Sequence, residues 1–251
     1  MIRTIVNADD FGISSEVNDA IALCFQKRMI TNTTLMVNMP YASDAVFMAK
    51  EAGFAERVGL HLNLTAGVPL TSPIRSCRLF CDKKGEFNAK FHLSTSTRLK
   101  VGKTESEALK EEIEAQIRRY LTFGLPEKHL DSHHHVHTDF SVWKVAEPLL
   151  RKYDFRSVRI SRNMYEKTNV FNALYKKKYN KRVQKTGMET TDFFGSFRDF
   201  EKYAPQLPEN ALVEIMLHPM FSEDGILMDT KIPMEQTADF IESQNVLAQA
   251  Y

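Results

Sequence analysis

One stretch of nine residues, 129–137, constrains this chain more than any other part of its sequence. It reads His-Leu-Asp-Ser-His-His-His-Val-His and so holds five of the eight histidines together with one carboxylate. Its place between a Leu-Pro turn and a helix-like run predicts a strand, on which Asp131, His133 and His135 would share one face. Imidazole is the commonest protein ligand for metal ions, and Asp131 would either accept the second N–H of His133 or bind the metal directly. The stretch therefore predicts a metal site rather than a solvated strand end.

Composition limits the kinds of partner that suit the chain. Its 33 Lys and Arg residues against 32 Asp and Glu residues give a net charge of +1, which favours neither nucleic acid nor an anionic membrane. No apolar run reaches membrane-spanning length, and the N-terminus leads into a strand without a signal-peptide core. Three cysteines are an odd and sparse set that suits a reducing compartment. We therefore expect a cytoplasmic protein.

Strand-like and helix-like segments alternate along the whole length of 251 residues. This alternation predicts one parallel-stranded α/β domain over residues 1–251. From about residue 66 to 104 the pattern is interrupted by Pro, Ser, Thr and Lys, which predicts an insertion that forms a hairpin or lid. Strands are expected over residues 4–6, 31–38, 58–65, 129–137, 157–162, 189–194 and 212–219, and helices over 15–27, 43–52, 105–123, 141–153, 169–185 and 234–250.

Acidic and imidazole side chains recur where four of these strands end. In parallel α/β folds, and in barrels especially, that edge of the sheet carries the functional site. Two imidazoles with one carboxylate leave coordination positions open for water and substrate, as in a catalytic metal site. The residues concerned are Asp9 and Asp10 after the first strand, and His61, His133 and His218 at the ends of three others.

Plainer explanations exist for each feature taken singly. An acidic pair after a strand can cap a helix, a lone histidine is usually structural, and the basic run near residues 176–182 suits a solvated helix face. Cys77 and Cys81 could share a metal, although no second pair follows at zinc-ribbon spacing. The convergence of four strands on one rim favours the functional interpretation.

Four motifs of the chain resemble the signatures of the YdjC/ChbG family of carbohydrate deacetylases. They span most of the sequence in the family's order, and the central one is long and specific. The resemblance implies an incomplete (β/α) TIM-like barrel of about seven parallel strands, similar to the NodB-type polysaccharide deacetylases. The motifs are Asn7-Ala8-Asp9-Asp10-Phe11-Gly12, His61-Leu62-Asn63, residues 129–137 and His218-Pro219.

The same resemblance implies roles for individual residues. His61 and His133 match the metal histidines of the family. By analogy with the NodB type, Asp10 would be the carboxylate ligand, Asp9 the catalytic base and His218 the catalytic acid. One divalent metal ion is expected: Mg²⁺ by family resemblance, or Zn²⁺ or Mn²⁺ from the ligand set. The family pattern continues about a strand further, which implies a barrel edge that is open or covered by a partner subunit, as in a homodimer.

The chemistry of these residues agrees with that resemblance. Amide hydrolysis needs an activated water, a stabilised oxyanion and a proton for the leaving amine. We therefore predict a metal-dependent hydrolase that removes acetyl groups from N-acetylated sugars such as chitooligosaccharides. The alternatives are a non-catalytic sugar-binding or regulatory protein, and a metal-dependent phosphoesterase with Arg159 and Arg162 near the rim. The spacing leaves open whether Asp131, His135 or His137 takes part directly.

Overall fold

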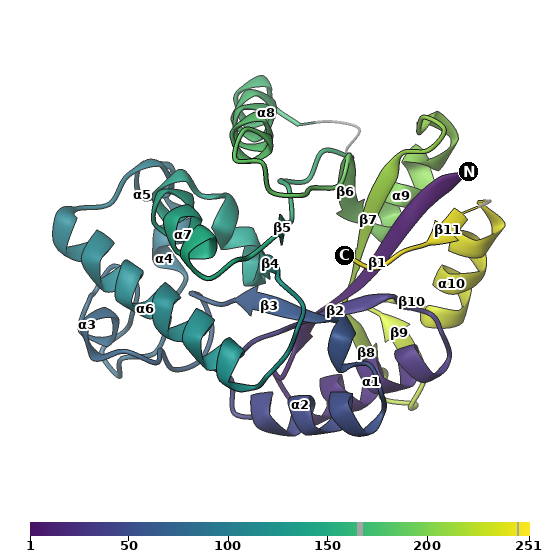
Figure 1. The fold of residues 1–251 in the computed structure, drawn as a ribbon, viewed down its shortest axis with the longest axis horizontal. Coiled ribbons are helices and arrows are strands. Elements are labelled where there is room, and N and C mark those ends of the chain that lie inside the picture. The colour runs from purple at the N-terminus through teal and green to yellow at the C-terminus, as the bar shows by residue number, and fades with distance from the viewer. Residues whose placement is uncertain (165–167, 245) are drawn as a thin grey trace.

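A curled parallel sheet is the framework of the protein. In the computed structural model, which describes residues 1–164, 168–244 and 246–251, seven strands follow the order β5-β4-β3-β2-β1-β7-β6. Each pairs in parallel with its neighbours, and helices surround the sheet, so the predicted incomplete barrel is confirmed (Figure 1). The strands are β1 (Ile2–Phe11), β2 (Asn32–Leu35), β3 (Val58–Leu62), β4 (His129–Ser132), β5 (Ser157–Val158), β6 (Phe193–Ser196) and β7 (Leu212–Leu217).

The helices form where the sequence provides apolar residues at helical spacing. In α6 the buried residues Leu109, Ile113 and Ile117 recur every four positions. In α1, Ser14 is the N-cap and its hydroxyl accepts a hydrogen bond from the Val17 backbone N–H at 3.2 Å. The helices that accompany the sheet are α1 (Ser15–Gln26), α2 (Ala42–Glu51), α6 (Lys103–Thr122), α7 (Phe140–Lys152), α8 (Val170–Gln184), α9 (Phe197–Tyr203) and α10 (Met234–Ser243).

Alternation along the strands separates an apolar layer from a polar barrel interior. On β3, Leu60 and Leu62 belong to the main hydrophobic core, whereas His61 between them is buried among polar groups. Four further charged residues of the barrel interior are fully or almost fully buried and lie on strands or directly after one: Asp9, Asp131, Arg159 and Glu214. Because buried charges must be paired, the interior of this barrel is held by ionic contacts as well as by apolar packing.

The histidine-rich stretch differs from its predicted strand. β4 ends at Ser132, and the next residues form a 3-10 helix, η2 (His133–Thr138), in which His134 and His135 have left-handed φ values of 52° and 56°. The prediction that Asp131, His133 and His135 share one strand face was wrong, because strand alternation stops at Ser132. Left-handed backbone is costly for residues other than glycine, so tertiary contacts must hold this turn.

The last part of the chain also departs from the prediction. The helix expected to reach residue 250 ends at Ser243, and β11 (Val246–Ala248) instead pairs in parallel with the start of β1. The prediction for residue 245 lies outside the described residues. A small antiparallel sheet precedes α10 and was not foreseen; it consists of β8 (Pro219–Phe221), β9 (Leu227–Asp229) and β10 (Ile232–Pro233).

The segment between β3 and α6 contributes no strand to the main sheet. It contains the short helices α3 (Ser72–Arg75), α4 (Lys90–Leu93) and α5 (Thr95–Leu99). The buried carboxylate of Glu112 on α6 anchors its beginning, since it accepts hydrogen bonds from the backbone N–H groups of Leu70 and Thr71 at 3.0 and 2.8 Å. We call residues 66–102 the insertion.

Hydrogen bonds narrow the gap between the edge strands β5 and β6. Ser157 and Glu189 form an isolated parallel bridge, and the Asn163 backbone N–H donates to the Phe194 carbonyl at 3.1 Å. These contacts join the two edges where an eighth barrel strand would otherwise stand. Among the described residues, none of the helices has the length and apolarity to cross a membrane.

Candidate active site

The strand ends singled out in the sequence meet at one cleft. Its volume is about 570 Å³, within the range of roughly 300–1,000 Å³ that is common for small-molecule sites. The fold therefore brings together the five residues predicted as metal ligands or catalytic groups. The cleft is lined by Asp9, Asp10, His61, His133 and His218, by Met216, His134 and His135, and by Ala89, His92 and Leu93 of the insertion.

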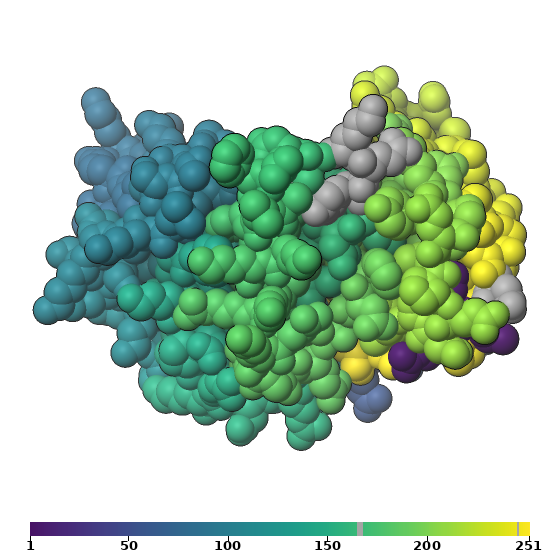
Figure 2. All heavy atoms as spheres, turned by 90° about the horizontal axis from the view of Figure 1, so that it is seen from above, coloured from purple at the N-terminus to yellow at the C-terminus, as the bar shows by residue number. Residues whose placement is uncertain are grey.

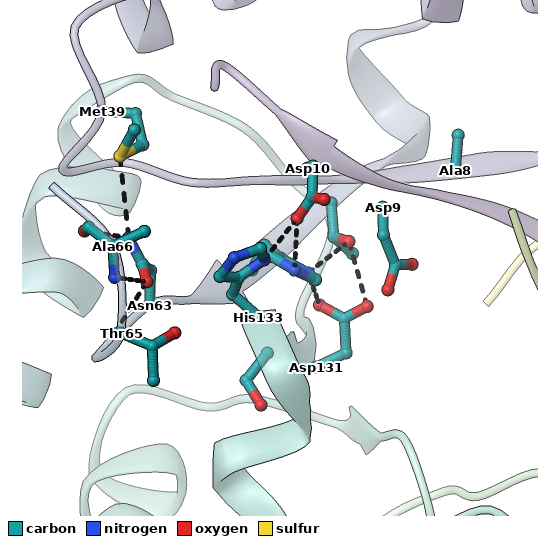
Figure 3. Close-up of polar contacts among 12 residues, drawn as sticks. Ala8, Asp9, Asp10, Met39, Asn63, Thr65, Ala66, Asp131 and His133 are labelled. Atoms are coloured by element: carbon teal, nitrogen blue, oxygen red, sulfur yellow. Dashed lines mark hydrogen bonds and ion pairs between the residues drawn. The ribbon is translucent and has the colours of Figure 1, made fainter. Parts of the chain in front are cut away.

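Asp10 lies between two imidazoles (Figure 3). Its Oδ1 is 2.7 Å from His133 Nδ1 and 3.2 Å from His61 Nε2, and the ligand atoms of the three residues all lie within 4.8 Å of one another. Although burial opposes ionisation, the contacts with His133 and His61 hold the pKa of Asp10 well below its usual value. The cluster thus presents an ionised carboxylate and two ring nitrogens to one point.

The surroundings of His61 suit a metal ligand. Its Nδ1 is 2.7 Å from Asp131 Oδ1 and 3.0 Å from the Thr34 hydroxyl, which itself donates to Asp131 Oδ2 at 3.0 Å. An N–H shared with this carboxylate leaves the lone pair on Nε2, which is buried and faces Asp10 Oδ1 at 3.2 Å. The donor set therefore fits one divalent cation. Asp131 contacts the ring of His61, whereas a contact with the ring of His133 was predicted, so that prediction was wrong.

The carboxylates around His61 favour a positive charge at this imidazole. Burial alone would lower the pKa of this imidazole, but Asp131 and Asp10 outweigh burial and raise it to about 10. The same two carboxylates that favour a proton on His61 would favour a divalent cation in its place, with release of that proton.

Arg159, directly after β5, holds the second carboxylate of the site. This fully buried guanidinium donates from Nη1 and Nη2 to the two oxygens of Asp9, at 2.7 Å each. Nη2 also lies 2.8 Å from Asp131 Oδ2, and Nε donates to Glu214 Oε1. Burial opposes ionisation of Asp9, yet Arg159 lowers its pKa well below the usual value.

Both arginines that were considered for a phosphoesterase site are already paired with carboxylates of the protein. Arg159 lies inside the barrel and not at the rim, which contradicts that part of the prediction. Arg162 donates from Nη2 to Asp199 at 2.5 Å, and it is absent from the residues that line the cleft.

A second layer of contacts supports Arg159 from the side away from the cleft. The Tyr251 hydroxyl donates to Glu214 Oε1 at 2.6 Å, and its ring stacks on His129 with centroids 3.4 Å apart. Burial raises the pKa of Glu214 to about 7, although Arg159 opposes this. Because His129 is the first residue of β4, this aromatic ring lies at the end of the barrel opposite the strand termini that carry the site.

The remaining histidines of the central stretch have separate environments. His137 is buried, with Nδ1 bonded to the Ser132 hydroxyl and Nε2 to the Arg159 carbonyl oxygen, so it stabilises the turn and the position of Arg159. His135 lies at the cleft with its ring edge toward Phe194. His134 is exposed and packs on His133, with centroids 4.1 Å apart.

Asp9 and His218 line the same cleft as Asp10, His61 and His133. His218 follows β7 directly, and its backbone N–H donates to Asp229 Oδ1 at 2.8 Å, which fixes the chain at this point. The two side chains are close enough for a charged His218 to contribute to the low pKa of Asp9. An acceptor and a potential donor of protons thus lie in one cleft.

Sequence reasoning missed the residues that hold this site in place. Thr34, Arg159 and Glu214 were not identified as its supports. A signal for two of them existed: a lone charged residue stands within each of the apolar runs 157–160 and 212–217. A charge in a buried strand needs an opposite charge, so these two residues could have been paired with each other and with the acids.

These features define an α/β half-barrel protein with a cluster of one acid and two imidazoles at its strand ends that could hold a metal ion. The sequence profile described as YdjC-like protein matches residues 3–248. A carbohydrate deacetylase of Clostridium beijerinckii is 34% identical over 238 residues, which cover 90% of this chain and 84% of the relative. The chain belongs to the YdjC-like family.

A further relative agrees with this assignment, and one solved structure shows the same fold. A carbohydrate deacetylase of Thermoanaerobacter pseudethanolicus is 28% identical and aligns over 98% of this chain and 97% of its own. The crystal structure of a proposed cellobiose-phosphate cleavage protein from Enterococcus faecalis V583 superimposes with a TM-score of 0.76 at 24% identity. That alignment covers 99% of this chain and 97% of the other, which shows the same fold.

The cluster of Asp10, His61 and His133 leads to a prediction about metal binding. If Asp10, His61 and His133 bind one cation, His61→Ala and His133→Ala should each lose it, because each substitution removes one of its three ligands. Elemental analysis after dialysis against Mg²⁺, Mn²⁺ or Zn²⁺ measures occupancy, and circular dichroism verifies that the variants are folded. His134→Ala, which removes an exposed neighbouring imidazole, is the matched control and should keep its metal. Full occupancy in either ligand variant would exclude that residue from the metal site.

Proposed function

We propose that this protein is a metal-dependent hydrolase that removes acetyl groups from N-acetylated sugars, with substrates that resemble chitooligosaccharides. The observation that carries this proposal is the cluster of Asp10, His61 and His133 in a cleft that also exposes Asp9 and His218. The names of the relatives, carbohydrate deacetylases, support the choice of sugar and acetyl group.

Asp10, His61 and His133 would hold the metal. A divalent cation bound there would polarise the acetyl carbonyl and lower the pKa of a water molecule. The imidazole ligands favour Zn²⁺ or Mn²⁺, whereas the resemblance of the motifs favours Mg²⁺. Asp131 and Thr34 keep the His61 ring oriented so that Nε2 faces the cluster.

Asp9 is placed to act as the general base. Arg159 keeps it ionised at neutral pH and fixes both of its oxygens, and Asn7 Nδ2 donates to Oδ1 at 2.8 Å. A carboxylate oxygen has more than one lone pair, so Asp9 can still accept a proton from the attacking water at the face turned to the cleft. The low basicity that Arg159 imposes is compensated by its fixed position beside the reacting groups.

His218 is placed to protonate the departing amine. It lies on a different strand end from Asp9, so the two groups reach the substrate from β7 and β1 respectively. An amine leaves readily only when it is protonated, and a charged imidazole supplies a proton in the pH range where Asp9 is ionised.

Release of acetate tests the proposed reaction. The purified protein with Mg²⁺, Mn²⁺ or Zn²⁺ should release acetate from the β-1,4-linked dimer of N-acetylglucosamine and no phosphate from sugar phosphates. Release of phosphate in place of acetate would identify a phosphoesterase, and release of neither from a broad panel of such sugars would contradict a hydrolytic role.

Substitution of the base should separate chemistry from metal binding. Asp9→Asn keeps the size and one of the two hydrogen bonds that Arg159 donates, but it removes the carboxylate that accepts the proton. Turnover should fall roughly a hundredfold or more, while metal occupancy stays at the wild-type level. A variant that retains wild-type turnover would show that another group accepts the proton.

Substitution of the acid should depend on the leaving group. His218→Ala should keep its metal and lose the limb of the pH–rate profile that reports an acid. The loss should be large for acetamides and small for an activated acetate ester, whose leaving group departs with little protonation. Loss of metal in this variant would make His218 a ligand, and equal losses on both substrates would contradict its role as the acid.

A further inference from the structure

The insertion contributes part of the cleft wall. Figure 2 shows the blue residues of this segment at one end of the molecule. Three of its residues line the same cleft as Asp10, His61 and His133. They are Ala89, the N-cap residue of α4, and His92 and Leu93 at the end of this helix. Ala89 has a left-handed φ of 56°, which turns the chain into α4 and directs these residues toward the cleft.

Asp139 fastens the insertion to the wall that carries His133. It is fully buried, and its two oxygens lie 2.7 Å from His92 Nδ1 and 2.6 Å from Arg98 Nε. Asp139 is also the N-cap residue of α7, yet its side chain makes no capping hydrogen bond. An aspartate at this position usually caps its helix, so here the carboxylate is used instead to hold two residues of the insertion.

This contact orients the His92 ring. With Nδ1 bonded to Asp139, Nε2 is the ring nitrogen left for other partners, and it has none among the described residues. The His92 side chain is 21% exposed, and the residue lines the cleft. Leu93 beside it is 81% exposed and lines the same cleft, so its apolar surface is free to contact a ligand there.

We propose that His92 and Leu93 form a sugar-binding wall of the active site. This inference rests on the proposed function, because it concerns the substrate of the same cleft. Nε2 of His92 would form a hydrogen bond with a sugar hydroxyl, and Leu93 would cover the apolar C–H face of a pyranose ring. A pyranose offers both kinds of surface side by side, which matches an oriented polar atom next to an exposed apolar side chain.

Asp139 makes this wall fixed. It binds His92 and Arg98 at one end of the insertion, while Glu112 holds Leu70 and Thr71 at the other. A ring that is already oriented loses little conformational freedom when it binds a hydroxyl, so affinity gains from the contact.

The chain provides matched controls for both residues. Arg98→Ala breaks the other half of the Asp139 contact without removing an atom that lines the cleft. Leu99→Ala removes an exposed leucine of the same insertion that does not line the cleft. Binding of the β-1,4-linked dimer of N-acetylglucosamine is measured by calorimetry on metal-loaded protein in an Asp9→Asn background, where hydrolysis of the sugar is slow.

His92→Ala and Leu93→Ala should each weaken binding about tenfold, the scale of one good contact, while Arg98→Ala and Leu99→Ala stay within about threefold of the parent. In the enzyme with Asp9 restored, His92→Ala should raise KM and leave kcat nearly unchanged. An unaltered Kd in His92→Ala, an equal loss in Arg98→Ala, or a parent that binds no such sugar would overturn the proposal. A protein that releases no acetate but binds the dimer through His92 would contradict the proposed reaction and keep the binding wall.

Discussion

The buried guanidinium of Arg159 is the interaction on which the rest of this structure depends. It brings Asp9, Asp131 and Glu214 together from three different strands of the barrel interior. A buried ion pair adds little to stability by itself, but the loss of one partner leaves an uncompensated charge that costs about 3–5 kcal/mol. Arg159 therefore allows several acids to coexist in a space where they would otherwise repel one another or become protonated.

The Arg159 guanidinium also helps to fix the position of His61, one of the three proposed metal ligands. Asp131 is shared: Oδ2 contacts Arg159 and Thr34, and Oδ1 contacts His61. The ring of His61 is thus fixed by a carboxylate that is itself fixed by Arg159. Asp9 is held by the same guanidinium, so the proposed base and a proposed metal ligand have one common support. Proton transfer and metal binding are expected to fail together when this support is disturbed.

The sequence predicted the sheet and the rim because both follow from strong local patterns. Strand order along the chain, parallel pairing and residues such as Asp10 and His61 at strand ends need only periodicity and the rule for parallel sheets. The turn at His134 and His135 could not be predicted, since its left-handed backbone is imposed by tertiary contacts. The same holds for β11, whose residues adopt a strand only because the start of β1 is free to pair with them. Contacts such as that of His92 with Asp139 join residues 47 positions apart and leave no periodic trace.

The claim that Arg159 supports the proposed metal site is tested most directly by the metal affinity of the Arg159→Lys variant. Lysine keeps the positive charge but cannot bind Asp9 through two parallel hydrogen bonds while also reaching Asp131 and Glu214. Arg159 touches none of the three proposed ligands, so a purely local metal site would be unaffected. Calorimetric titration with Mn²⁺ or Zn²⁺ should show affinity reduced roughly 10- to 100-fold in a folded variant, as for loss of a group that orients a ligand. Wild-type affinity in folded Arg159→Lys would contradict the account.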